Sequence, residues 1–386
     1  MSLDDDRSST LTLLYDYGFN RDLVTIMIDT GPDSETNDEL KHRAKSILSE
    51  MGSTITSVGP HGLRTSDLLD AMMEGSQAAG LSSGVRYSAA AIIAAYQKGE
   101  ASNSSASELI KLAHDWFLFF LWPCMLSSLF ASHCSESSES EFTPTPRASE
   151  VSADTVLATS RGSKFRNLIS ERDDKCVVTR TLNIHKGPYP PGTKGHEGLL
   201  NATHILPRSV VHEHSGSNVT RVAATIDIIK HFTKLPENIL DNLSGVIDNP
   251  ENGMLLDMTM HDTFNSYMWC LHSTDILHKY KVHWFRPVPM GMGNFTEVQF
   301  QDNSQTDIQH PDPTFIALRS ALAHILHLSG AADVINKVHE AFFDEGSTVP
   351  FENCASQEDF LIRLSLIELM TTKHQLATNP HGTQGH

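Results

Sequence analysis

The stretch NPENGMLLDMTMHDTF, residues 249–264, decides the fold of the central part of this chain. Asn252 is followed by glycine, a pair that is typical of a turn. The apolar residues directly after this pair indicate a short buried strand, and His261 lies near the beginning of a helical pattern. The stretch therefore predicts a turn, a strand over 253–257 and a helix over 258–272.

A second strand, with a histidine near its end, is predicted upstream. The sequence LLNATHILP, residues 199–207, reads as a strand that ends at Pro207 and carries His204 close to that end. The long segment between His204 and Asn252 contains an amphipathic helix over 222–234. The polar face of this helix has few carboxylates, so we expect the helix to shape the cleft rather than to supply chemistry.

The order of His204, Asn252 and His261 resembles the pattern of the HNH endonuclease family, and more closely the branch of that family in fungal genomes. The similarity covers about residues 155–335, and the nine-residue spacing from Asn252 to His261 also fits. The matching pieces are RDDKCVVTR, NATHILPRS, NPENGMLLDMTMHDTF and PDPTFIALRSALAHILHLSGA. The resemblance implies an α+β, mostly helical fold, in which a small ββα-metal core with a helical insertion is flanked by N- and C-terminal helices.

The resemblance also implies roles for five residues. Hydrolysis of a phosphodiester needs a base that deprotonates water and a divalent cation that stabilises charge on the phosphate. By resemblance, His204 is the base, and Asn252 braces the loop that orients it. His261 is the metal ligand, with Asn265 one turn later as a second ligand and Thr203 as a third. The implied ion is Mg²⁺, with Mn²⁺, Ni²⁺ or Zn²⁺ as alternatives, and no small-molecule cofactor is implied.

Thr203 departs from the family pattern. Many HNH enzymes have Asp, Glu or His directly before the base, and threonine is a poor metal ligand. Asp257 and Asp262 are close enough in sequence to compensate for it. Two functions therefore stay open. One is a metal-dependent endonuclease whose partner is nucleic acid, DNA in particular; the other is an HNH-fold binding or interaction module with weak or no catalysis.

Charge is distributed unevenly along the chain. The net charge is −18, but residues 161–300 carry 15 Lys and Arg against 14 Asp and Glu. Contacts with phosphates need cations, so this middle part is the segment whose net charge does not repel nucleic acid. Six basic residues at its beginning form either a phosphate track or a solvated helix face: Arg161, Lys164, Arg166, Arg172, Lys175 and Arg180.

The five cysteines are scattered and form no C-x-x-C pair. This usage fits a reducing compartment and predicts neither a disulfide framework nor a cysteine-based zinc site. The N-terminus MSLDDDRSST lacks an apolar segment after a basic one, so no secretory signal is expected. We therefore expect an intracellular protein, either cytoplasmic or nuclear.

The most apolar run is WFLFFLWPCMLSSLF at 116–130. It is too short for a membrane span, which needs about 20 residues, so no transmembrane segment is expected. We interpret the run as a buried helix broken at Pro123, with a membrane-surface segment as the alternative.

Composition predicts five parts along the chain. These are a helical N-terminal region at 1–131, a linker rich in Ser, Glu and Pro at 132–157, an HNH-like domain at 158–300 that begins with a helix (158–174) and a strand (175–180), C-terminal helices packed on that domain at 301–375, and a disordered tail at 376–386.

Overall fold

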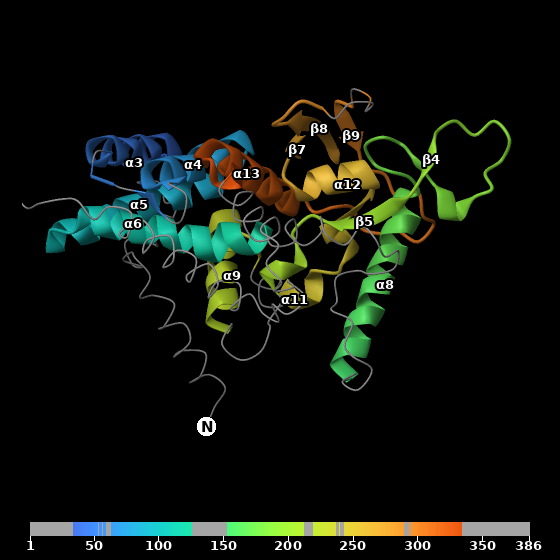
Figure 1. Cartoon of the computed structure of the whole chain (residues 1–386), viewed down its shortest axis with the longest axis horizontal. Helices are drawn as coiled ribbons and strands as arrows, with labels where there is room; N and C mark the ends of the chain where they lie inside the picture. The colour runs from blue at the N-terminus through green and yellow to red at the C-terminus, as the bar shows by residue number, and fades with distance from the viewer. Residues whose placement is uncertain are drawn as a thin grey trace, which may run out of the picture.

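The structure is a computed structural model, and it is mostly helical with small sheets (Figure 1). The residues that it describes are 34–52, 54–55, 57–58, 63–125, 153–211, 219–236, 239, 243–288, 293 and 295–333. The predicted linker up to residue 152, the predicted C-terminal helices after residue 333 and the predicted tail lie outside these described residues.

The N-terminal part consists of helices that pack on one another. Its elements are α3 (Asn37–Met51), β1 (Ser57–Val58), β2 (Leu63–Arg64), α4 (Thr65–Ala78), α5 (Ser82–Ser102), α6 (Ser105–Trp116) and the π-helix η1 (Phe117–Leu121). Helix α3 begins with a capping box, in which Thr36 and Glu39 satisfy each other's backbone N–H groups.

The central part is a mixture of short strands and helices. It contains α8 (Ala153–Asp173), β3 (Leu182–Asn183), η2 (Ile184–Lys186), β4 (Glu197–Gly198), β5 (Leu200–His204), η3 (Arg208–Val210), α9 (Val219–Thr233), α11 (Leu243–Val246), η4 (Pro250–Asn252), β6 (Gly253–Asp257), α12 (Met258–Asn265), β7 (Trp269–Ser273), β8 (Lys279–Trp284) and β9 (Glu297–Gln299). The last described element, α13 (Pro313–Ser329), begins at a proline after the cap Asp312 and ends at Gly330, which has a positive φ.

Strands β5 and β6 pair antiparallel. Strand β6 then leads directly into α12, and the three elements form the expected ββα unit. In their register, Ala202 lies opposite Leu255 and His204 opposite Gly253. Ala202 and Leu255 pack on Phe165 of α8, because residues directly opposite each other share one face of a sheet. The predicted α+β, mostly helical fold with a ββα core is therefore confirmed.

Two predicted elements are wrong. The helix predicted over 258–272 ends at Asn265, because Tyr267 adopts a positive φ and the chain then enters strand β7. The strand predicted over 175–180 is a turn. The backbone N–H of Cys176 donates to the carbonyl of Thr181, and the N–H of Arg180 donates to the carbonyl of Cys176. A single β-bridge forms there, between Lys175 and Leu182.

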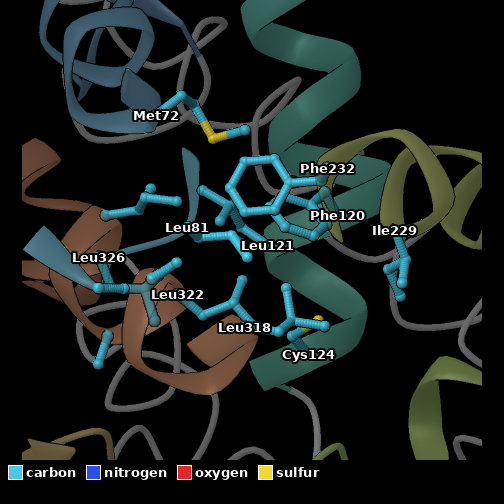
Figure 2. Close-up of a cluster of buried hydrophobic side chains, with 14 of the residues drawn as sticks. Met72, Leu81, Phe120, Leu121, Cys124, Ile229, Phe232, Leu318, Leu322 and Leu326 are labelled. Atoms are coloured by element: carbon cyan, nitrogen blue, oxygen red, sulfur yellow. The ribbon is translucent and has the colours of Figure 1, made fainter. Parts of the chain in front are cut away.

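One hydrophobic core joins segments that are far apart in sequence. Figure 2 shows side chains of α4, η1, α9 and α13 meeting in it, among them Met72, Phe120, Phe232 and Leu322. Helix α13 packs on α4 and also lies across β7. The same core therefore reaches from the N-terminal helices to the three-stranded sheet β7–β8–β9.

Most of the apolar run that the structure describes, at 116–125, is buried within this core, and residues 126–130 lie outside the described residues. Its helix continues through Pro123 to Met125 rather than breaking, and it widens to a π-helix just before the proline. In an α-helix the N–H of residue 123 would donate to the carbonyl of Phe119, but proline has no N–H. The hydroxyl of Thr225 donates to that carbonyl oxygen instead, at 2.6 Å. Among the described residues, no helix is long and apolar enough to cross a membrane.

Candidate functional site

His204 lies at the end of β5, against helix α8. Its ring stacks on Phe165, with 4.0 Å between ring centroids and 8° between planes. The partner of His204 across the sheet is Gly253, which has no side chain and therefore leaves room for the Phe165 ring. The position of the imidazole is thus set by a strand end and by an aromatic ring from another element.

The carboxylate of Asp248 forms a hydrogen bond with the imidazole of His204. The Nε2 atom of His204 lies 3.0 Å from Oδ1 of Asp248, and Nε of Arg208 donates to the same oxygen at 2.7 Å. Partial burial raises the pKa of Asp248, but the hydrogen bonds from His204 and Arg208 outweigh it and lower the pKa below its ordinary value. The carboxylate therefore stays ionised at neutral pH and accepts from both bases.

Asn252 is fully buried and braces the chain after His204. Its Oδ1 accepts from the backbone N–H of Leu206 at 2.8 Å, and its Nδ2 donates to the carbonyls of Leu206 at 2.8 Å and Ile247 at 2.9 Å. Asn252 thereby joins the end of β5 to the segment that carries Asp248. That this bracing orients a catalytic base stays a prediction.

A buried ion pair at the end of α8 fixes the beginning of β6. The guanidinium of Arg172 contacts the carboxylate of Asp173 at 2.7 Å and donates to the carbonyls of Pro250 and Gly253. Asp173 in turn accepts from the N–H of Leu255 at 2.7 Å. Arg172 is fully buried, so it belongs neither to a phosphate track nor to a solvated helix face, and both sequence readings of this residue are wrong.

His261 and Asn265 lie together on α12. Nε2 of His261 is 3.2 Å from the amide of Asn265. Burial lowers the pKa of His261, with Asp262 acting against this effect and His204 adding to it. The imidazole is therefore neutral at physiological pH, which is the form that binds metal ions.

Thr203 lies on the opposite face of β5 from His204, since neighbouring residues of a strand alternate. Its side chain is buried, and its hydroxyl donates to the carbonyl of Asn201 at 3.4 Å. Asp257 caps α12 by accepting from the N–H of Met260 and also accepts from the hydroxyl of Thr179. The carboxylate of Asp257 is therefore engaged in structure.

The donor atoms on α12 suit part of a metal site. Two ligands of one ion with bonds of about 2.1 Å are about 3.0–3.4 Å apart, which matches the His261–Asn265 distance of 3.2 Å. Exchange of the amide nitrogen and oxygen of Asn265 by rotation would present an oxygen to the ion. Within the described residues, no three His, Cys, Asp or Glu ligand atoms converge at this place, so water and phosphate would have to complete the coordination.

A strand–strand–helix unit with a histidine on the first strand, an asparagine in the turn and a histidine on the helix defines a ββα nuclease-type finger. Residues 176–272 match the family model described as HNH endonuclease, so this part of the chain is similar to that family. The matched segment includes β5, β6 and α12 and ends within β7. Comparison with curated proteins and with solved structures gave no match.

The sequence did not indicate two residues that contact the predicted base. Asp248 belongs to the insertion and comes after its helix, and the structure brings it against His204. Its position, four residues before Asn252, was the available signal, because a residue so close to the bracing asparagine has to lie near the strand end. Phe165 had no such signal, since it comes from a helix far upstream.

Proposed function

We propose that the chain is a metal-dependent endonuclease that hydrolyses phosphodiester bonds, with DNA as its substrate. The single observation that carries the proposal is the contact of His204 with Asp248 inside the HNH-family segment. A histidine on a carboxylate, held at a strand end and close to a second, neutral histidine, is an arrangement suited to deprotonating water.

His204 acts as the general base in this proposal. With Asp248 accepting the Nε2–H, the lone pair of the neutral ring is on Nδ1, which takes the proton from water. The resulting hydroxide attacks the phosphorus atom, a new P–O bond forms, and the bond from phosphorus to the leaving oxygen breaks. Asp248 stabilises the imidazolium that remains, and solvent protonates the leaving oxygen.

His261 and Asn265 would hold the divalent ion. When bound, the ion supplies positive charge to the phosphate and the leaving oxygen. One imidazole and one amide make a site with few protein ligands, so we expect weak metal binding that tightens when a substrate phosphate joins the coordination. An imidazole ligand favours Mn²⁺ or Ni²⁺ over Mg²⁺ in the resting protein.

Cleavage of supercoiled plasmid in the presence of Mn²⁺, Ni²⁺ or Mg²⁺ tests the proposal. The variant His204→Ala should lose roughly 10²- to 10⁴-fold in rate, which is the usual contribution of a general base. His231→Ala is a matched control, because His231 also faces an aspartate, Asp227 at 3.5 Å, but lies on α9 outside the site. Undiminished cleavage by the His204 variant would rule out His204 as the base.

The second function is a binding module that keeps the finger without catalysis. The observation that favours it is the weak donor set: Thr203 is buried, and Asp257 is already engaged by Thr179 and Met260. It predicts no cleavage with any of the three ions, and a melting temperature that addition of Mn²⁺ changes equally in the wild type and in His261→Ala.

A further inference from the structure

A second group of metal-binding side chains lies outside the ββα unit, on strand β7. Cys270 and His272 are two positions apart on this strand, so both project from the same face. His283 of β8 lies directly opposite Cys270 in the register and therefore shares that face. The strand pair thus presents one thiol and two imidazoles on one side.

Helix α13 covers this face and adds a third imidazole. The hydroxyl of Ser320 donates to the carbonyl of Leu271 at 2.6 Å, which anchors the helix on the strand. His324, one turn later on the same helix face, then reaches His272, with 2.8 Å between their Nε2 atoms. Ligand atoms of Cys270, His272 and His324 all lie within 4.8 Å of one another.

The surroundings keep these donors uncharged in the absence of an ion. Burial lowers the pKa of His324 to about 4, with further lowering by His272 and His283. Burial raises the pKa of the Cys270 thiol to about 12, while Ser320 and Arg319 act against this effect. A neutral imidazole presents a lone pair, and a bound metal ion deprotonates a thiol, so such a group can accept an ion by releasing one proton.

We propose that Cys270, His272 and His324 bind a zinc ion that fastens α13 to the sheet. One sulfur and two nitrogen donors are the ligand types that zinc prefers, and the group contains no carboxylate that would favour Mg²⁺ or Ca²⁺. Tetrahedral zinc needs about 3.3 Å between two nitrogen ligands, so His272 and His324 have to separate by only about half an ångström. Water or His283 takes the fourth position.

This site is distinct from the ion of the proposed nuclease centre. The HNH-family match ends at residue 272, and His324 comes from α13, well outside it. The two sites also differ in chemistry, since His261 and Asn265 offer one imidazole and one amide. The zinc ion therefore has a structural role here: it joins the sheet next to the nuclease core to the helix that packs on α4.

Cobalt substitution of the purified full chain tests the proposal directly. Co²⁺ added to metal-free protein should give the intense thiolate-to-cobalt absorption and the strong visible bands of a tetrahedral sulfur–nitrogen site. Zn²⁺ should then abolish this spectrum at one equivalent. A wild-type protein that shows no thiolate-to-cobalt band overturns the proposal, and in that case His272 and His324 form a hydrogen bond in an ordinary core.

Variants identify the ligands. Cys270→Ser should remove the thiolate band, whereas Cys124→Ser, a buried thiol that also lies near Arg319, should keep it. His261→Ala should keep it as well, because this variant affects the nuclease centre alone. A band that persists in Cys270→Ser excludes Cys270 as the ligand and overturns the site.

A milder variant tests the site if Cys270→Ser does not fold. His272 is only partly buried, and His272→Gln should weaken Zn²⁺ binding by roughly 100-fold or more, as loss of one of three protein ligands requires. Zn²⁺ should also raise the melting temperature of the wild type and not that of this variant. Equal Zn²⁺ affinity of the variant and the wild type contradicts the proposal.

Discussion

At the scale of single residues, Asp248 is the group on which the proposed base depends. One of its oxygens accepts from both His204 and Arg208. The carboxylate fixes which nitrogen of the imidazole carries the proton, and it does so from a segment that Asn252 ties to the strand end. Asp248 is therefore a positioning residue, which acts on the reaction through His204.

We predict that Asp248→Asn lowers kcat roughly 10- to 100-fold and leaves KM nearly unchanged. An asparagine can turn its NH₂ group toward His204, and the imidazole then presents the wrong tautomer to water. Plasmid cleavage rates as a function of substrate concentration measure both constants. Asp227→Asn, in the half-buried pair with His231 on α9, is the control and should have wild-type kinetics. A purely structural role for Asp248 would instead lower the melting temperature without changing kcat of the folded fraction.

Residues of the site differ in how well the sequence could predict them. Asn252 and His261 lie nine positions apart within one continuous stretch, and local turn and helix signals were enough to place them. Asp248 and Phe165 reach His204 only because an insertion and a helix fold back onto β5. Such contacts depend on tertiary structure. The nearness of Asp248 to Asn252 in the sequence was the one local signal, and Phe165 had none.

At the scale of elements, the close approach of α8 to β6 sets the position of His204. A Cβ atom on Gly253 would lie 2.5 Å from Cζ of Phe165 and 2.8 Å from Cδ1 of Ile169. These distances are too short for any real contact, so glycine is required here for α8 to lie on the strand. The same Phe165 ring stacks on His204, and the packing of α8 is therefore coupled to the site.

We predict that Gly253→Ala lowers the free energy of unfolding by about 1–3 kcal/mol, because the added methyl group pushes α8 away from β6. The displaced Phe165 should also reduce cleavage activity. Urea unfolding and plasmid cleavage measure the two effects. Gly52→Ala is the control: Gly52 has helical φ and ψ at the end of α3, and its substitution should be neutral or slightly stabilising.

Elements with a clear apolar period were predictable, and boundaries set by tertiary contacts were not. Helices α9 and α13 follow their apolar patterns closely. The end of α12 at Asn265 was missed because the residues of β7 are as apolar as a buried helix. The Cys270–His272 pair was missed for a related reason: a search for C-x-x-C spacing does not detect ligands at alternate positions of a strand, and His324 lies 52 residues further on.

At the scale of the whole molecule, the shared core makes the N-terminal helices and the HNH-like part depend on each other. Composition predicted separate parts, but it could not show that α13 packs both on α4 and on β7. The residues of this core come from the N-terminal helices, from most of the central part and from α13, whereas Phe165 and Ile169 of α8 form a separate small cluster with Leu255. Since the core residues bury one continuous cluster, we expect the regions that they come from to unfold together.

Glu74 of α4 offers a test of this coupling far from the site. It forms ion pairs with Lys41 and Lys45 of α3. Partial burial raises the pKa of Glu74, but the hydrogen bonds from Lys41 and Lys45 outweigh it, so the pKa lies below its ordinary value. The unfolded state therefore binds more protons near pH 4, and the stabilisation by Glu74 is complete above about pH 4.5 and disappears as the pH falls through the folded pKa.

We predict that Glu74→Gln lowers the free energy of unfolding at pH 6 by about 0.5–1 kcal/mol, and that the difference from wild type vanishes at low pH. In a chain with Trp116 and Trp122 replaced by Phe, fluorescence reports only Trp269 and Trp284 of the sheet. Because the core is shared, this signal should shift with the helical circular dichroism signal. If Glu74→Gln leaves the unfolding transition seen by tryptophan fluorescence unchanged and shifts the one seen by circular dichroism, the two parts unfold independently.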